Sequence, residues 1–573
     1  MADGTRPEER AEARRLARFG ALAVGFVFLA RAVVFLYRAH PQDDAYILFG
    51  YVRRFVAGEG IVFHAGGPPA EGATDFLWFA LLSVLHRAGL DIAVAAALAN
   101  AAGGALLGGL IARAIARSLT PGPARSMLLL LLAPAAFAGG AVAAAVGFGS
   151  LLYSAAVAWT FVAAIAALEG DERATLRLPF AGLLLGLIRP DGVVLGAGFA
   201  LIGACAAARR RLVGPFAARA SAALAIGAAY FAWRWSYFGL PLPLPLYVKG
   251  HSADELAGAS AIAGWFSHPS GAWPLGAGLV AVLVLGGRAA RTATLALAAT
   301  PLLAHLAALA FARQSQNIAF RFEAPEQAVL LVLLVLASAA AIEMARAPAV
   351  RTLVVLVAVA AVVPGVLLGI RQLRYYEGTR TYVDVFGPRL GAILAPEDRV
   401  ALGDQAGRIP YWSRARMFDL VGLNTRRTAL APPDAAYLAE IDPDLFLLYT
   451  GPSTFDLEKA LASAKEDVVP LALPELAGSV RPDQRDLYEH GIARYEGSAV
   501  PDSACNVIAA KYLVDSSAYD LYAVRYTGSF KHLYAIRRGH PRAAAILAAL
   551  RESLAPESYR SYARIVGLPF ARD

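Results

Sequence analysis

Long apolar runs between residues 19 and 370 constrain the fold of this 573-residue chain more than any other feature. Apolar residues make up 58% of the sequence and charged residues only 17%, a balance typical of proteins that cross a membrane several times. Residues 371–573 return to a soluble composition, and about 200 residues can bury a core of their own. We therefore predict a polytopic α-helical membrane domain over residues 1–370 and a separate α/β domain over residues 371–573.

Arginines in the loops between the apolar runs predict the direction in which each run crosses. They occur in five loops, at residues 113–125, 169–177, 209–211, 288–291 and 343–351. The N-terminal arm is also rich in arginine, so the N-terminus and these loops are expected in the cytoplasm. All five loops are satisfied by eleven spans, at residues 17–38, 92–116, 126–143, 150–168, 174–189, 191–208, 214–236, 272–288, 292–312, 326–344 and 350–370. An odd number of spans puts the α/β domain on the outer face.

This topology requires that the apolar stretch Thr74–Leu90 does not cross the membrane. At about 17 residues it is shorter than the ~20 residues that a span needs, so we expect a re-entrant or partly inserted helix. Residues 45–63 show a helical period with one polar side, which predicts an interfacial helix. Residues 39–91 would then form a first external loop that contains both helices.

Net charge and cysteine content argue against nucleic-acid binding and against a disulfide. The net charge of +9 comes mainly from the N-terminal arm and the short loops, so topology explains it and nucleic-acid binding is not expected. Cys205 lies in an apolar run and Cys505 in the α/β domain, so no disulfide is expected between them. Short β-like runs at 398–402, 444–449 and 521–537 indicate a compact α/β domain.

Adjacent carboxylates at Asp43 and Asp44 follow the first apolar run directly. A carboxylate at a membrane face could act as a general base that deprotonates an acceptor hydroxyl group. Two alternatives stay open: the pair could cap the helix that follows, or a divalent metal could bind there, although no cluster of Asp, Glu or His lies nearby. We favour Asp44 as the base because it begins the interfacial helix and would be held more rigidly.

Several cationic residues are predicted on the same outer face. Arg189 lies in a tight hairpin between two apolar runs, where its charge needs a partner, either Asp191 or a lipid phosphate. Four more lie in or beside two external loops: Arg234, Lys249, His251 and Arg321. Such cations suit an anionic headgroup, and arginine binds phosphate through paired donors. Alternatively, these cationic side chains could extend toward the membrane interface without binding any ligand.

Motifs in the first external loop resemble a known family. Three runs carry the resemblance, Asp43-Asp44-Ala45-Tyr46-Ile47, Glu59-Gly60-Ile61-Val62-Phe63 and Glu71-Gly72-Ala73-Thr74-Asp75-Phe76-Leu77-Trp78. They are similar to the first external loop of GT-C glycosyltransferases of the bacterial cell-wall arabinofuranosyltransferase type. Later segments agree in the same order, at residues 187–192, 234–249, 320–325, 403–413 and 419–424.

The resemblance implies a GT-C fold in the bacterial cytoplasmic membrane, with an extracytoplasmic C-terminal domain. It implies inverting transfer of a sugar, arabinofuranose among the candidates, from a polyprenyl-phosphate donor to a hydroxyl group of a cell-envelope glycan or glycolipid. Asp43 or Asp44 would be the base, and Arg189, Lys249 and Arg321 would bind the donor phosphate. No cofactor beyond the lipid-linked donor is implied, and a divalent metal stays open.

Acceptor binding would fall partly to the outer domain, where Tyr411 and Trp412 could stack on sugar rings, with Glu71 joining them from the first loop. Packing in the core is the commoner role of such aromatic residues. Two positions depart from the family's pattern. The run Gly147-Phe148-Gly149-Ser150 lacks an acidic residue that relatives carry, and Asp75 stands where Asn is usual. The missing carboxylate motivates an alternative, a non-catalytic assembly or regulatory protein on the GT-C scaffold. A lipid-linked sugar transporter is disfavoured because paired internal repeats are not evident.

Overall fold

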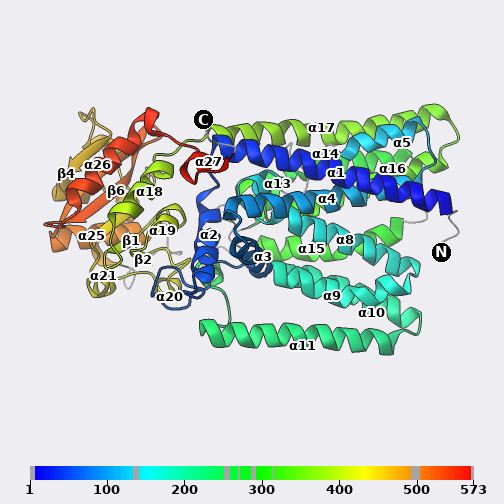
Figure 1. Ribbon diagram of the computed structural model, residues 1–573, viewed down its shortest axis with the longest axis horizontal. Coiled ribbons are helices and arrows are strands. Elements are labelled where there is room, and N and C mark those ends of the chain that lie inside the picture. Colours follow the sequence, from blue (N-terminus) through cyan, green and yellow to red (C-terminus); the bar gives the residue numbers. More distant parts are fainter. Residues whose placement is uncertain are drawn as a thin grey trace.

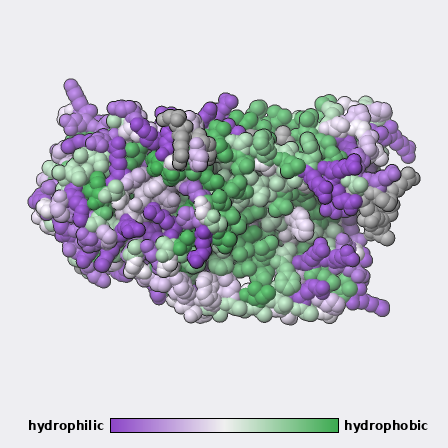
Figure 2. Space-filling model, in the orientation of Figure 1, coloured by the Kyte–Doolittle hydropathy of each residue, from purple (hydrophilic) through white to green (hydrophobic). Residues whose placement is uncertain are grey.

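The computed structural model has two parts joined end to end, a helical membrane domain and an α/β domain (Figure 1). It describes residues 7–132, 141–250, 258–268, 271–285, 292–312, 314, 317–491 and 504–569. Apolar side chains cover the middle of the membrane domain as a broad band, and hydrophilic side chains gather at both ends of the molecule (Figure 2). This distribution is the one expected of a protein that crosses a bilayer.

The membrane domain is a bundle of helices of very unequal length. Its elements are α1 (Pro7–Arg38), α2 (Asp43–Val56), α3 (Phe76–Arg87), α4 (Ile92–Ser118), α5 (Pro123–Leu128), η1 (Leu129–Leu131), α7 (Ala141–Ala145), α8 (Ser150–Glu169), α9 (Glu172–Ile188), α10 (Gly192–Arg209), α11 (Val213–Phe238), α12 (Leu244–Gly250), α13 (Ala259–Ser267), α14 (Ala272–Leu285), α15 (Thr292–Ala310), η2 (Ile318–Phe320), α16 (Ala324–Met344) and α17 (Pro348–Gly378).

Seven of the described helices are long and apolar enough to cross a membrane: α1, α4, α8, α10, α11, α16 and α17. An eighth span results if the bent pair α13 and α14 counts as one. The described residues therefore support seven or eight spans instead of the eleven predicted. Two predicted spans correspond to shorter helices, α9 and α15, and the one at 126–143 lies partly outside the described residues. Because the odd span number carried the outer location of residues 371–573, that location stays a prediction.

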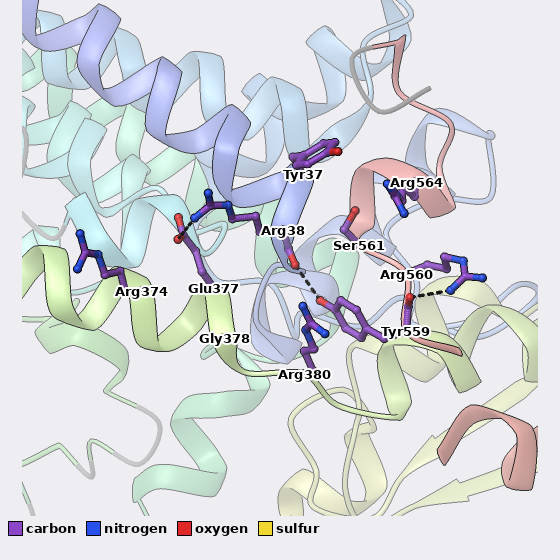
Figure 3. Close-up of a pocket in the computed structure, with 10 residues that line it drawn as sticks. All are labelled: Tyr37, Arg38, Arg374, Glu377, Gly378, Arg380, Tyr559, Arg560, Ser561 and Arg564. Carbon is purple, nitrogen blue, oxygen red and sulfur yellow. Dashed lines mark hydrogen bonds and ion pairs between the residues drawn. The ribbon is translucent and has the colours of Figure 1, made fainter. Parts of the chain in front are cut away.

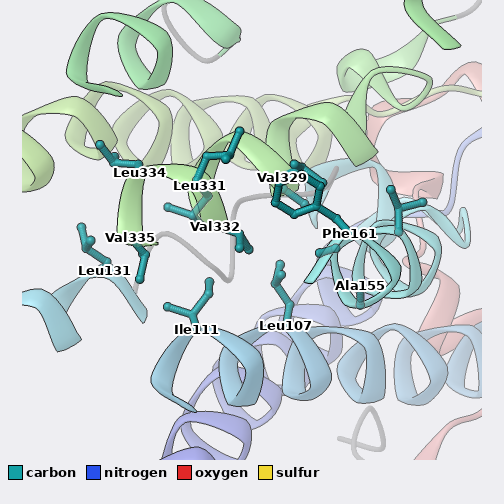
Figure 4. Packing of buried hydrophobic residues seen from close by; sticks show 14 of the residues in the cluster. Leu107, Ile111, Leu131, Ala155, Phe161, Val329, Leu331, Val332, Leu334 and Val335 are labelled. Carbon is teal, nitrogen blue, oxygen red and sulfur yellow. The ribbon is translucent and has the colours of Figure 1, made fainter. Parts of the chain in front are cut away.

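The core of the membrane domain lies where α4, α8 and α16 meet. Leu107 of α4, Phe161 of α8 and Val332 of α16 are buried within one apolar cluster (Figure 4). The backbones approach closely at Gly103, where a Cβ atom would stand 2.6 Å from the Cα atom of Leu152. Small residues thus permit tight helix contact here, as they commonly do between membrane helices.

The two helices of the first loop lie at the end of the bundle nearest the α/β domain. The short helix α2 runs crosswise to the neighbouring α1 (Figure 1), and its location at a membrane interface stays a prediction. The helix α3 has 12 residues, well below the ~20 that a span requires. The expectation that Thr74–Leu90 does not cross is consistent with this length.

A six-stranded mixed sheet forms the centre of the α/β domain, with the strand order β2-β1-β3-β6-β5-β4. The strand β1 pairs in parallel with β2 and β3, and the remaining pairs are antiparallel. The elements are α18 (Val383–Ile393), β1 (Arg399–Leu402), α19 (Arg408–Trp412), β2 (Arg416–Asp419), α20 (Arg426–Leu430), α21 (Ala435–Ile441), β3 (Leu445–Tyr449), α22 (Leu457–Ala460), β4 (Val468–Leu471), α23 (Leu473–Ser479), η3 (Pro482–Gln484), α24 (Arg485–His490), α25 (Ala504–Ser516), β5 (Tyr519–Tyr526), β6 (Ser529–Arg537), α26 (Ala543–Leu554), η5 (Pro556–Ser558) and α27 (Tyr562–Ile565).

Contacts that fix the α/β domain to the end of the bundle include two made by aromatic side chains. The carboxyl end of β1 leads through a short loop into α19, which packs on α2 with the rings of Tyr46 and Tyr411 5.1 Å apart. At the C-terminus, the hydroxyl group of Tyr562 in α27 donates to the Asp91 carboxylate at 2.8 Å. The loop after β1 is therefore held against the Asp43–Asp44 pair.

Candidate functional site

The two adjacent aspartates at the start of α2 have different partners. The Asp43 carboxylate accepts hydrogen bonds from the backbone N–H groups of Gly407 and Arg408, at 3.0 and 2.8 Å. A side chain at Gly407 would collide with the Asp43 backbone, so glycine permits this approach. The Asp44 carboxylate instead accepts from the Arg321 guanidinium at 3.0 Å, with a quarter of its side chain exposed. Asp43 thus joins the two domains, while Asp44 remains accessible.

Burial raises the pKa of the Asp43 carboxyl group to about 6, against the opposing effect of the nearby Arg408 guanidinium. Arg408 is itself held by Asp384, with an Nε to Oδ1 distance of 2.9 Å. Its guanidinium also donates to the Pro41 carbonyl oxygen at 3.1 Å. This network belongs to the junction between the domains, so it serves to position the start of α2.

Arg321 lies almost buried in the turn before α16 and makes two kinds of contact. Its guanidinium carbon stands 4.0 Å from the centre of the Phe148 ring, in addition to the ion pair with Asp44. The Nη1 atom is buried and has no hydrogen-bond partner among the described residues. The segment that lacks the expected acidic residue thus supplies an aromatic face, and a side chain at Gly149 would collide with Trp78.

Arg189 follows α9 and points toward the same place. Its Nε donates to Asp191 Oδ1 at 3.0 Å, which is the local pair weighed from the sequence. Its guanidinium carbon lies 5.2 Å from the centre of the Phe322 ring, and that of Arg321 lies 5.1 Å from the same ring. Two cations that are distant in sequence therefore flank one aromatic side chain.

Asp75 is a third carboxylate in this cluster, and sequence reasoning noted it only as a departure from a family pattern. It precedes α3, and burial raises its pKa while the charges of Arg189 and Arg321 lower it. Its hydrogen-bond partner is the hydroxyl group of Thr74 at 3.2 Å. Its position within the family-like run at residues 71–78 was the signal that could have identified it.

A buried polar chain supports Asp191 from within the membrane domain. His305 of α15 lies 3.2 Å from Asp191 Oδ2 through Nε2 and 2.6 Å from Glu326 Oε1 through Nδ1. Both His305 and Glu326 are buried. Sequence reasoning missed this pair, although ionisable residues inside apolar runs are a readable sign of a functional or structural constraint.

Two residues predicted to bind substrates are paired with each other. The Glu71 carboxylate accepts from Arg234 Nε at 2.7 Å and lies 2.6 Å from its Nη2 atom. Arg234 Nη1 donates to the Pro241 carbonyl oxygen at 2.8 Å. Both side chains are buried, so in this structure they tie the first loop to the segment after α11.

Of the remaining residues predicted to bind donor or acceptor, the structure describes the side chains of some and not of others. Lys249 belongs to α12, which contacts α20, but its side chain lies outside the description, as does all of His251. Tyr411 is 6% exposed, and its ring packs edge-on against Trp412 at 4.8 Å. Tyr411 therefore has the packing role weighed above, whereas Trp412 is partly exposed.

The cluster formed by Asp44, Asp75, Arg189, Asp191 and Arg321 is the candidate site. It combines carboxylates that could take a proton with guanidinium groups that could receive a phosphate. No group of three or more His, Cys, Asp or Glu side chains suited to a metal ion occurs in the part of the chain that the structure describes.

This chain is similar to one family model over part of its length and to solved structures. Residues 372–500, in the first part of the α/β domain, match a family model described as Domain of unknown function (DUF8728). No curated protein matches the sequence. A crystal structure of ArnT from Cupriavidus metallidurans in the apo state is similar with a TM-score of 0.39 and 16% sequence identity, covering 78% of this chain and 96% of that chain. Similarity at this level carries no conclusion about substrate or reaction.

Proposed function

We propose that this chain is a membrane glycosyltransferase of the GT-C type that uses a polyprenyl-phosphate sugar as donor. The observation that carries the proposal is the Asp44 carboxylate 3.0 Å from Arg321, with the Arg189 guanidinium near the same Phe322 ring as that of Arg321. A carboxylate and two cations at one end of a membrane bundle are what transfer from a lipid phosphate requires. The sequence motifs around Asp44 and Asp75 support the same assignment.

In the proposed reaction, Asp44 accepts the proton of the acceptor hydroxyl group. The acceptor oxygen then forms a bond to the anomeric carbon as the bond from that carbon to the phosphate oxygen breaks. The electron pair leaves with the polyprenyl phosphate, and its negative charge is received by Arg321 and Arg189. Attack opposite the leaving group inverts the anomeric centre.

Asp44 suits the role of base better than Asp43 does. Both oxygens of Asp43 already accept backbone N–H groups of the α/β domain. Asp44 has a partly exposed carboxylate, and its one cationic partner among the described residues is Arg321. When donor phosphate draws Arg321 away, the Asp44 carboxylate becomes available to the acceptor.

The other residues divide between substrate contact and support. Lys249 remains a proposed phosphate ligand, and Trp412 a proposed acceptor contact because its ring is partly exposed. Glu71 and Arg234 hold each other, so we assign them to positioning the first loop. Tyr411 is assigned to packing at the domain junction.

The proposed location is the bacterial cytoplasmic membrane, with the N-terminus in the cytoplasm and the site outside. Arginine-bearing loops support this orientation. A reporter that is active only outside the cytoplasm, fused after residue 400, would test it. Activity of the reporter supports the orientation, and its absence would reverse it.

The enzyme proposal is tested with full-length protein in proteoliposomes. Radiolabelled polyprenyl-phosphate sugars, arabinofuranose among them, are supplied with cell-envelope oligosaccharide acceptors. We expect Asp44→Asn to lower kcat by about 10²–10⁴-fold, the usual contribution of a general base. The matched control is Glu59→Gln, which removes an exposed carboxylate from the same loop and should retain activity.

Two results would overturn the assignment. Equal activity of Asp44→Asn and Glu59→Gln would show that Asp44 is not the general base. No transfer by the wild-type protein with any donor of the panel would favour the non-catalytic scaffold, for which the missing acidic residue near Gly149 is the motivation.

A further inference from the structure

A second group of arginines lies apart from the candidate site, where α1, α17 and the C-terminal segment meet. It lines a pocket of about 760 Å³ (Figure 3). Five guanidinium groups and one carboxylate border this pocket: Arg38, Arg374, Arg380, Arg560, Arg564 and Glu377. None of the residues of the candidate site belongs to its lining.

The carboxylate does not neutralise the pocket. Glu377 is already shared by Arg31 and Arg38, whose guanidinium nitrogens lie 2.6 and 3.4 Å from its two oxygens. Arg380 lies over the Tyr559 ring at 4.8 Å, and an aromatic ring does not cancel a formal charge. The lining therefore carries surplus positive charge.

In the part of the chain that the structure describes, Arg560 and Arg380 contact backbone carbonyl groups or an aromatic ring and no carboxylate. Arg560 donates to the backbone carbonyl groups of Glu557 and Tyr559 at 2.7 and 2.9 Å. These carbonyl groups carry no formal charge, so they orient the guanidinium without neutralising it. Arg374 and Arg380 are exposed side chains of α17 and the turn that follows it. Flexible exposed guanidinium groups can close around an anion with paired hydrogen bonds.

The pocket lies at the level where the apolar surface of the bundle ends. Phe26 of α1 is 72% exposed and Leu367 of α17 is 61% exposed, as expected of side chains that face lipid tails. Further along the same helices, the exposed Tyr37 and Tyr375 stand next to the arginines. Tyrosine is enriched at membrane interfaces, which is where lipid headgroups lie.

We propose that this pocket binds the phosphate headgroup of an anionic membrane lipid, with the acyl chains lying along α1 and α17. Charge complementarity selects the headgroup, and the exposed apolar flanks of the two spans accept the chains. The bound lipid would connect α17 to the C-terminal segment through Arg380 and Arg560. This site is independent of the glycosyltransferase proposal.

The test measures lipid binding to purified full-length protein in a neutral detergent by microscale thermophoresis. The probes are short-chain phosphatidylglycerol, short-chain phosphatidylcholine and inorganic phosphate. The variant Arg374→Gln/Arg380→Gln should bind phosphatidylglycerol about 10- to 30-fold more weakly, since each arginine near a membrane surface contributes ~1 kcal/mol. The control Arg346→Gln/Arg351→Gln removes two exposed arginines from the other end of the α17 region and should bind as the wild type does.

The outcomes separate the possible ligands. Preference of the wild type for phosphatidylglycerol over both other probes, lost only in the pocket variant, supports the site. Equal competition by inorganic phosphate would indicate a free-anion site and overturn the lipid assignment. Equal loss in the pocket and control variants would reduce the effect to general surface charge. If the double variant fails to give a monodisperse peak in size-exclusion chromatography, the single variant Arg374→Gln replaces it, with an expected loss of roughly fivefold.

Discussion

The candidate site and the arginine pocket are both arginine-rich regions at the same end of the bundle, yet they are built differently. In the candidate site, Arg189 and Arg321 are almost buried, and each has a carboxylate partner at 3.0 Å. In the pocket, exposed arginines surround one carboxylate, Glu377, which is already shared. The candidate site is buried and its positive and negative charges are paired, whereas the arginine pocket is exposed and carries surplus positive charge.

The difference indicates two kinds of task. A transfer reaction needs both signs of charge, because one group must take a proton while others receive a leaving phosphate. Capture of an anion needs only positive charge and access from the membrane surface. The two regions should therefore respond differently when a charge is removed, when salt is added and when the pH changes.

The largest expected difference is in stability. Buried ion pairs at this end of the bundle include Glu71 with Arg234, outside the candidate site itself. Replacing Arg234 by Gln leaves Glu71 buried without its partner and should lower the free energy of unfolding by about 3–5 kcal/mol. Replacing the exposed Arg374 of the pocket should change it by less than about 0.5 kcal/mol. Unfolding by titration with sodium dodecyl sulfate measures both. The double variant Glu71→Gln/Arg234→Gln should lose less stability than the sum of the losses of the two single variants. Equal losses of stability for Arg234→Gln and Arg374→Gln would contradict the proposed difference between buried and exposed arginines.

The next difference is kinetic. Arg321→Gln should lower kcat by about 10²–10³-fold, as loss of one donor to a developing negative charge typically does. If Arg321 only captured the donor anion, as the pocket arginines are proposed to capture lipid, KM would rise and kcat would not change. Steady-state kinetics over a range of donor concentrations distinguishes the two cases, with Arg346→Gln as an active control.

The response to salt should also differ between the candidate site and the arginine pocket, but by less than the kinetic effects. Raising ionic strength from about 0.1 to 1 M shortens the screening length from ~10 to ~3 Å, which weakens contacts between exposed charges and affects buried pairs much less. Binding of short-chain phosphatidylglycerol to the pocket should therefore fall several-fold over this range, while kcat for sugar transfer changes little. A parallel fall in both quantities would show that the candidate site is as open as the pocket.

Much of the architecture could be predicted because it follows from local patterns. The division into two domains follows composition, and strands β1, β3, β5 and β6 lie where the short β-like runs predicted them. The described residues support seven or eight spans and not eleven, because hydropathy identifies apolar residues but does not fix where a helix ends. The helix α9, for example, has only 17 residues.

The candidate site was predictable in its residue types and only partly in its contacts. The sequence analysis placed Asp44, Arg189 and Arg321 on one face of the membrane, and the structure brings them to the same end of the bundle. Glu71 and Arg234, in contrast, are 163 positions apart, and a pairing at that separation depends on tertiary structure. Their assignment to separate substrates from sequence could not anticipate that each satisfies the other.

The different partners of Asp43 and Asp44 could be predicted only in part. Adjacent residues on a helix point about 100° apart, so divergence of the two carboxylates follows from geometry. Which of the two meets the α/β domain does not follow, because that depends on how the loop at Gly407 docks. The smallest predicted effect concerns this contact.

Asp43 should make the stability of the protein depend on pH in a direction opposite to that of an ordinary paired aspartate. Its pKa in the folded protein is raised from 3.8 to about 6, so between these values the folded form retains a proton that the unfolded chain has released. The folded form then binds more protons, and the free energy of unfolding falls as the pH rises through this window. Asp43→Asn cannot titrate and should lack this contribution.

The measurement is the difference in melting temperature between Asp43→Asn and the wild type at pH 4, 5, 6 and 7. Asparagine has one acceptor oxygen for the N–H groups of Gly407 and Arg408, so a loss on the order of 1 kcal/mol is expected at pH 4, where the wild-type carboxyl group is still protonated. The informative quantity is the slope, because the variant should gain stability relative to the wild type as the pH rises from 4 to 6.5. A difference that stays flat over this range would mean that Asp43 is exposed to solvent and that the contact between α2 and α19 is looser than the enclosed site requires.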